Sequence, residues 1–328
     1  MGPTLSRTLA MSLSFLFRTL SLCLLAGAAI AQAPPQPCKV PPPPSSEEIQ
    51  AASKRPADRG FLWRIEKDDR ASWLYGTMHV GTPDGYFVGS KVRGALRQSD
   101  TLALELDLAD PDTAAVFTEA VPPALLARLL TPERQRRLDR QVAAACLPPG
   151  VFARVRPVLQ VTTLAGLALR QQGLRFEFGS EHFLGAYARS NKKPLVALET
   201  ARGQLQALIG DDEAEETRGV DEALDQLESG HALEVAARLA AAWARSDWAE
   251  LDNYRAWCDC VKTPADERAL RRLLDDRNPG LANGIAALHD KGQRVFAAVG
   301  ALHMVGAQGL PTLLAARGFT VARVLPAP

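Results

Sequence analysis

Strand-like apolar runs near both ends of the sequence, separated by a long helical region, constrain the fold more than any other feature. The runs near the amino end are residues 61–65, 72–76 and 101–108, and those near the carboxyl end are 294–300 and 320–325. Alternating or short apolar runs of this kind are typical of strands. Because neither end has enough strands for a sheet of its own, we expect an α/β (α+β) fold whose mixed central sheet joins both ends.

The middle of the chain is predicted to be a large helical insertion. Residues 213–257 are rich in Ala, Leu, Glu and Arg, have apolar residues three and four positions apart, and contain no proline. Thr131 and Thr263 each precede a proline, which is typical of a helix start. A short apolar run at 194–199 predicts one further strand within this region.

Residues 1–31 have the pattern of a secretory signal peptide. Apolar runs flanked by arginine lead to a small-x-small sequence that ends at Ala31, where we expect cleavage. Arg18 interrupts the apolar stretch, which translation from Met11 instead of Met1 would explain. The uninterrupted apolar segment is too short for a stable membrane span. We therefore expect a periplasmic or secreted protein.

Composition separates residues 32–58 from the rest of the chain. This segment is so rich in proline that we expect an extended linker, followed by a single folded domain over 59–328. The whole sequence is 47% hydrophobic and 23% charged, with a net charge of +1, as in ordinary globular proteins. Positive and negative charges are mixed along the chain, so we expect no nucleic-acid partner.

The cysteines suggest disulfides. An even number would remain after signal cleavage, as expected for an exported protein with bridges: Cys38, Cys146, Cys258 and Cys260. The sequence does not choose among the three possible pairings. A metal half-site at Cys258 and Cys260 is the alternative, although no second closely spaced Cys or His pair accompanies it.

Two distant segments share one pattern, an apolar strand run followed by Gly-x-x-His. The first contains Gly76 and His79, and the second contains Gly300 and His303. Glycine allows the backbone to leave a strand at a close approach, and strand ends are where α/β sheets place active-site groups. We therefore expect both histidines to bind one metal ion. The remaining histidines lie in helical stretches and are expected at surface or core positions: His182, His231 and His289.

A carboxylate is needed to complete such a site, because two imidazoles alone bind a divalent ion weakly. In residues 101–108 the leucines occupy one strand face, whereas Ala103, Glu105 and Asp107 occupy the other. A buried charge is costly unless it is paired, bound to metal or near water. Glu105 is therefore the predicted third ligand, with Asp107 as the reserve ligand or base. An edge strand with one wet face is the alternative.

The ordered series of motifs between about residues 60 and 325 resembles the TraB/PrgY/GumN family. The family is similar to the Tiki proteins, membrane-tethered metalloproteases that need manganese or cobalt, and more distantly to the erythromycin-esterase and ChaN-like group. The resemblance implies metal-dependent peptide hydrolysis. It is carried by the runs 61–65, 75–81, 101–108, 198–200, 276–278, 299–306 and 309–321, and it maps the family motifs onto Gly76, His79, Glu105, Arg277, Gly300 and His303. Glu181 departs from the aspartate of many members.

These residues predict metal-assisted hydrolysis of an exported peptide or protein. A divalent ion, manganese or cobalt with zinc possible, would be held by His79, Glu105 and His303 and would activate water. Glu105 could instead be the general base. Arg277 is expected to stabilise the oxyanion or bind a substrate carboxylate, with helix capping or ion pairing as alternatives.

Three further expectations accompany this interpretation. Asn278 is a second substrate-binding candidate or the N-cap of the following helix. A non-catalytic protein that sequesters a peptide or a metal is the alternative function. A structural role in the cell envelope comes third.

Overall fold

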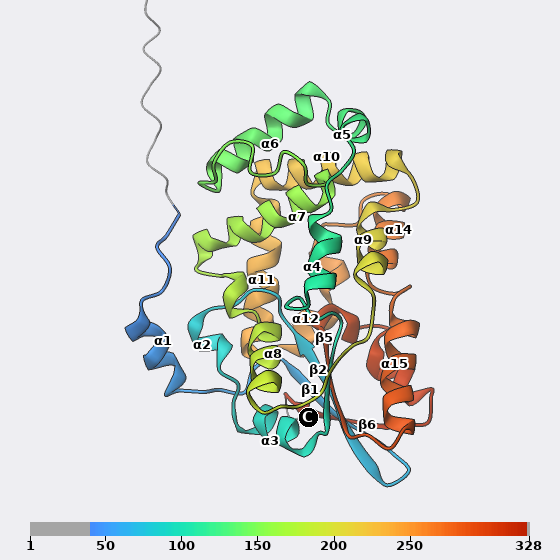
Figure 1. Cartoon of the computed structure of the whole chain (residues 1–328). Coiled ribbons are helices and arrows are strands. Elements are labelled where there is room, and N and C mark those ends of the chain that lie inside the picture. Colours follow the sequence, from blue (N-terminus) through green and yellow to red (C-terminus); the bar gives the residue numbers. More distant parts are fainter. Residues whose placement is uncertain (1–39, 327–328) are drawn as a thin grey trace, which may run out of the picture. The chain divides into compact units, whose positions relative to one another are not determined.

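Residues 40–326 are described by a computed structural model, and they contain one six-stranded mixed sheet (Figure 1). The strand order is β4-β3-β5-β2-β1-β6. The four neighbours β4, β3, β5 and β2 are parallel, whereas β1 is antiparallel to both β2 and β6. The strands are β1 (Phe61–Lys67), β2 (Arg70–Thr77), β3 (Thr101–Leu104), β4 (Leu195–Ala197), β5 (Val295–Gly300) and β6 (Thr320–Leu325). The predicted sheet from both ends of the chain is confirmed.

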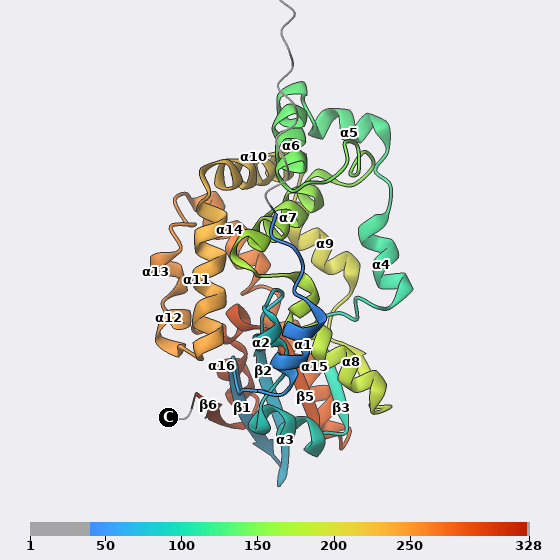
Figure 2. The same cartoon turned by 90° about the vertical axis from the view of Figure 1, so that its left-hand side faces the viewer.

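Most helices lie between β3 and β5 in the sequence, so the predicted helical insertion is also confirmed. Figure 2 shows the helices α11 to α13 of this insertion on one side of the molecule and α4 and α8 on the other. The insertion comprises α4 (Pro111–Thr118), α5 (Pro123–Leu129), α6 (Pro132–Ala144), α7 (Pro157–Ala168), η1 (Leu169–Gln172), η2 (Phe176–Phe178), α8 (Ser180–Ser190), α9 (Ala201–Ile209), α10 (Glu213–Ser229), α11 (His231–Arg245), α12 (Trp248–Asp252), α13 (Tyr254–Trp257), α14 (Pro264–Leu273) and α15 (Asn278–Asp290). Outside it lie α1 (Ser46–Ser53), α2 (Pro83–Tyr86), α3 (Ser90–Gln98), η3 (Ala301–Met304) and α16 (Leu310–Ala315).

Local signals explain where several of these helices begin and end. The hydroxyls of Thr131 and Thr263 accept hydrogen bonds from backbone N–H groups three residues later, at 3.3 and 3.2 Å, as predicted for N-caps. The Ala-rich region 213–257 is divided into four helices. Its first break is at Gly230, where φ is +81°, a left-handed conformation that glycine adopts without steric cost.

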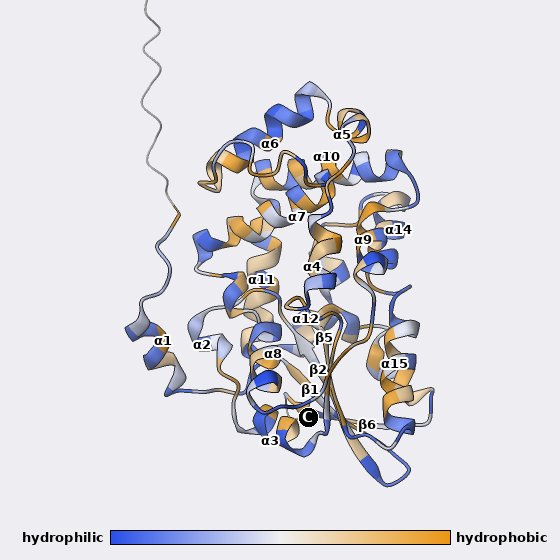
Figure 3. Ribbon diagram, viewed as in Figure 1, coloured by the Kyte–Doolittle hydropathy of each residue, from blue (hydrophilic) through white to orange (hydrophobic). Residues whose placement is uncertain are grey.

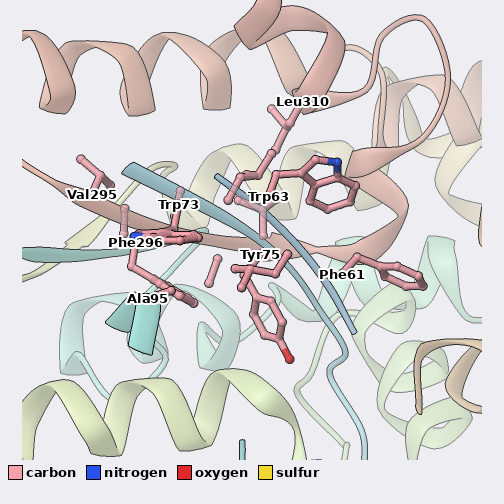
Figure 4. Packing of buried hydrophobic residues seen from close by; sticks show 14 of the residues in the cluster. Phe61, Trp63, Trp73, Tyr75, Ala95, Val295, Phe296 and Leu310 are labelled. Carbon is pink, nitrogen blue, oxygen red and sulfur yellow. The ribbon is translucent and has the colours of Figure 1, made fainter. Parts of the chain in front are cut away.

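The main hydrophobic core covers both faces of the sheet. Figure 4 shows Leu310 of α16 on one side of the strands, and Tyr75 and Ala95 on the other. All four residues of β3 are buried, as expected of a parallel strand inside a sheet. The strand predicted over 101–108 ends at Leu104. Its residues do not alternate between a buried and an exposed face, although the sequence pattern predicts this alternation.

A second core joins α6, α7 and α10 within the insertion. Figure 3 shows both orange and blue residues along α10, which is typical of a helix with one apolar face, whereas the sequence of α7 is mostly apolar. Glu216 of α10 is buried there, and its carboxylate accepts from the Arg156 guanidinium at 2.9 and 2.7 Å. The insertion thus has its own apolar packing and its own buried ion pair.

The segment expected to be an extended linker contains a helix. Ser45 and Glu48 form a capping box that starts α1, and Ala52 of α1 is buried. The carbonyls of Pro41 and Pro42 each accept from the Arg175 guanidinium at 2.7 Å. The prediction of an extended linker was based on the proline content and did not take the capping box of α1 into account. The predicted signal peptide, residues 1–31, lies outside the described residues.

Cys258 and Cys260 are joined by a disulfide, with their Cα atoms 5.0 Å apart. The sequence left the pairing open, and Cys38 lies outside the described residues. Among residues 40–326, no helix is both long and apolar enough to cross a membrane.

Candidate active site at the carboxyl edge of the sheet

The four parallel strands each lead into a polar residue at the same edge of the sheet. Glu199 follows β4, Glu105 follows β3, His303 follows β5 through η3, and His79 follows β2. Because parallel strands have their carboxyl ends on one edge, residues far apart in sequence are brought together there. The structure therefore places both predicted histidines and Glu105 in the same region.

Gly300 lies at the point where these side chains meet. A Cβ atom built on Gly300 would be 3.2 Å from Glu105 Oε1, 3.5 Å from His303 Cδ2 and 3.9 Å from His79 Nε2. At Gly76, a Cβ atom would be 3.3 Å from the Cα atom of Ala301. Neither glycine has a positive φ. Both motif glycines therefore provide space for a close approach.

His303 is buried, and one of its ring nitrogens is engaged by Asn278. His303 Nδ1 lies 2.6 Å from Asn278 Oδ1, while Asn278 Nδ2 donates to the Gln308 carbonyl at 2.7 Å. The second bond orients the amide so that Oδ1 accepts from Nδ1–H, which leaves the lone pair on Nε2. Burial, assisted by the charge of Arg277, lowers the pKa of His303 to about 4. The imidazole is therefore neutral at physiological pH.

His79 is held from the opposite side by α8. Its Nδ1 lies 2.8 Å from Glu181 Oε1, although this ion pair lacks the alignment of a hydrogen bond. The Glu181 carboxylate raises the pKa of His79 to about 9. Two hydrogen bonds to α8 fix the loop that follows β2 and carries His79. Met78 N–H donates to the Ser180 hydroxyl at 2.8 Å, and the Met78 carbonyl accepts from Ser180 N–H at 2.9 Å. The imidazole is 69% exposed. In the metal-free protein both ring nitrogens carry a proton at physiological pH, so a metal ion would bind Nε2 only by displacing its proton.

Glu105 is bound on both oxygens. Oε1 accepts from Gly300 N–H at 2.7 Å, and Oε2 accepts from Arg277 at 2.5 Å and from Gln204 at 3.0 Å. Arg277 also donates to both oxygens of Glu199, at 2.9 and 2.5 Å. Although burial opposes ionisation, His303, His79 and Arg277 lower the pKa of Glu105 to about 2. Two carboxylates share one guanidinium, which leaves one net negative charge beside the histidines.

These donors fit a metal ion in part. His79 and His303 have the arrangement of metal-binding histidines, with Nδ1 held by a carboxylate or an amide. Nε2 of the neutral His303 has its lone pair free, whereas Nε2 of His79 would first have to lose its proton. Glu105 Oε2 is occupied by Arg277 and Gln204, whereas Oε1 accepts a single hydrogen bond and keeps a second lone pair. Within residues 40–326, no group of three or more His, Cys, Asp or Glu side chains is arranged to hold a metal ion. The donors are therefore of the right type for an ion, but they are not arranged as a complete site.

Three expectations need correction or refinement. Arg277, not Asn278, is the N-cap of α15, and Asn278 is buried against His303. Arg277 makes the ion pairs that were the alternative to a substrate contact. Asp107 does not face the same way as Glu105, because the chain leaves the sheet after Leu104. Its Oδ1 instead accepts from Ala109 N–H at 3.0 Å and lies 3.4 Å from Arg189.

Sequence reasoning missed three residues of this site: Glu181, Glu199 and Gln204. Glu199 had a usable signal, because it follows the apolar run 194–199 much as Glu105 follows its own strand. Glu181 was assigned no role, and Gln204 lies on α9 without a distinguishing pattern. Helical residues such as these reach the site only through tertiary packing.

Comparison with known proteins places the chain among its relatives. It is similar to the uncharacterised protein YbaP of Shigella flexneri, with 26% identity over 142 residues, or 43% of this chain and 53% of that protein. YbaP of Escherichia coli strain K12 is 26% identical over 137 residues, or 42% of this chain and 51% of that protein. The chain therefore spans about half the length of the curated relatives it matches. No solved structure matches it significantly.

The family match is much longer. The profile of the TraB/PrgY/gumN family covers residues 61–323, from the first strand into the last. It includes both Gly-x-x-His segments, Glu105 and Arg277. On the extent of this match, the chain belongs to the TraB/PrgY/gumN family.

Proposed function

We propose that this chain is an exported, metal-dependent hydrolase that cleaves a peptide or protein. The observation that carries the proposal is the convergence of His79, Glu105 and His303 around Gly300. The resemblance to the Tiki metalloproteases supports the same chemistry and suggests manganese or cobalt, with zinc possible. His79 and His303 would hold the ion through Nε2, and Glu105 is the candidate third ligand.

The residues around this point have separable roles in the proposal. A bound divalent ion supplies a Lewis acid that activates water and polarises a carbonyl. Glu181 and Asn278 orient the two imidazoles from behind. The Glu105 carboxylate places negative charge beside both rings, which favours a cation. Arg277 lies next to Glu105 and is the candidate for stabilising negative charge that develops on the substrate.

Metal analysis of the purified protein tests the proposal. We expect bound metal in the wild type and in His231→Ala, a control on α11 whose Nε2 contacts the Cys258 carbonyl. We expect the metal to be lost from His79→Ala and His303→Ala, together with manganese-dependent cleavage of generic peptides. Equal metal content in all four proteins would contradict the proposal. Peptide binding without cleavage, unaffected by His79→Ala, would support the sequestering alternative.

Export is tested separately by cell fractionation and by sequencing the amino end of the mature protein. Cleavage after Ala31 gives a chain that begins at Gln32 in the periplasm or the medium. A cytoplasmic protein that retains residues 1–31 would contradict this part of the proposal.

A further inference from the structure

A cleft of about 380 Å³ opens beside the candidate active site, between α8 and the loop that follows β3. We infer that this cleft binds a neutral, apolar side chain of the substrate next to the bond that is cleaved. The inference rests on the proposed function and adds a substrate class to it. The volume of the cleft is at the lower end of the range for sites that bind small ligands.

The cleft and the active site share structural elements. Glu181 lines the cleft and also holds His79, 2.8 Å from its Nδ1. Leu104 and Leu106 line the cleft and flank Glu105 in the sequence. A substrate whose reacting bond lies beside His79 and Glu105 therefore has its neighbouring residue within reach of the cleft.

The carboxylates that line the cleft already have cationic partners in the protein. Asp107 lies 3.4 Å from Arg189, and Glu181 is paired with His79. Glu177 lies 3.7 Å from Arg175. An ionic substrate side chain would have to compete with these pairs, whereas a neutral one would not. The charge arrangement therefore favours an uncharged occupant.

The shape of the lining favours an apolar occupant. Leu104 and Leu106 are buried in the wall, and Leu108 is 59% exposed although it is large and hydrophobic. On α8, Ala186 is small and exposed and lines the cleft, whereas Gly185 is covered by the Arg189 guanidinium. An apolar side chain placed here would remove its own surface and that of Leu108 from water.

Binding of blocked pentapeptides to the full mature chain tests the inference. The peptides are alanine except for a central Leu, Ala, Glu or Lys, and dissociation constants are measured calorimetrically with and without manganese. We expect the Leu peptide to bind at least tenfold more tightly than the Glu and Lys peptides. Ala186→Trp, which fills the cleft from an exposed position, should abolish this preference. Ala287→Trp, at an exposed alanine of α15 away from the cleft, should preserve it.

A second variant changes the charge of the cleft without filling it, so it tests the inference independently of Ala186→Trp. Leu108→Glu adds a carboxylate without a partner to the cleft, so it should shift the preference from the Leu to the Lys peptide. Equal binding of all four peptides, no measurable binding of the Leu peptide, or an unchanged preference in Ala186→Trp would overturn the inference. Selective binding of the Leu peptide without cleavage would preserve it while refuting hydrolysis. Cleavage without selectivity would do the reverse.

Discussion

His303 and His289 are both buried histidines beside the parallel strands, but they lie at opposite edges of the sheet. His289 Nδ1 lies 2.9 Å from the Ser72 hydroxyl, and its Nε2 lies 3.0 Å from the Lys67 carbonyl. Of the two ring nitrogens of His303, only Nδ1 has a hydrogen-bond partner in the described part of the chain, and this partner is Asn278. The protein therefore uses both nitrogens of one ring and a single nitrogen of the other. Both rings are buried, so what distinguishes His303 is its second ring nitrogen, which the described part of the chain leaves without a hydrogen bond.

The largest expected effect is on catalysis at the carboxyl edge. His303→Ala removes a proposed metal-binding nitrogen, so we expect metal-dependent peptide cleavage to fall by about 10³-fold or more, equivalent to about 4 kcal/mol in the barrier. Cleavage rates and metal content measure the effect. A variant that remains folded and retains full activity would contradict the contrast between the two histidines.

The complementary change is His289→Ala at the amino edge. It removes two hydrogen bonds and leaves a cavity in a fully buried position, so we expect a loss of about 2–4 kcal/mol in the free energy of unfolding. Denaturant unfolding measures the loss, and metal content per folded molecule should not change. Loss of metal from this variant under conditions where it is folded would show that the two edges are not independent.

A smaller effect is expected behind His303. Asn278→Ala removes the acceptor of Nδ1–H, so we expect metal affinity to fall by about 10–100-fold. Asn278→Asp is the matched variant, because it retains an acceptor for Nδ1–H and loses the bond to the Gln308 carbonyl. Titration with manganese compares the two variants. Equal loss in both would show that the contact with His303 is not what matters.

The smallest effect is expected from an ion pair at the amino edge. Hydrogen bonds from the Arg294 side chain and backbone lower the pKa of Asp100 to about 2. A carboxyl group whose pKa is lowered by folding stabilises the protein above its unfolded pKa of about 3.9, and this contribution is lost as pH falls towards 2. Because both side chains are more than 40% exposed, we expect about 1 kcal/mol or less.

Thermal unfolding of Asp100→Asn measures this contribution. The difference in Tm from the wild type should be present at pH 6 and should be much smaller at pH 2, where about half of the folded molecules have lost the charge. A difference that is undiminished at pH 2 would have to arise from something other than the charge of Asp100.

The sequence predicted those parts of the site that depend on local pattern and sheet geometry. His79, Glu105 and His303 each follow an apolar run, and parallel strands bring such ends together. Asp107 was placed incorrectly because the predicted strand was extended past Leu104, where β3 ends and the chain leaves the sheet. The helix α1 was missed because composition outweighed its capping box.

Other parts of the site could not be predicted because they depend on tertiary contacts. Arg277 reaches Glu105 across 172 positions of the sequence, and Gln204 reaches it across 99. The periodicity of apolar residues gives no information on contacts between residues so far apart in the sequence. The shared guanidinium, the support of His79 by Glu181 and the adjoining cleft therefore required the structure.

The position of β5 in the sheet has a consequence for the nascent chain. β5 lies between β2 and β3, although more than half of the sequence separates it from both. Until Val295–Gly300 has been synthesised, these two amino-terminal strands lack the neighbour that lies between them, and their edges can pair with other polypeptides. A chain truncated within α15 would lack His303 and would have unpaired strand edges. Completion of the chain is therefore a precondition both for assembling the site and for protecting the sheet from aggregation.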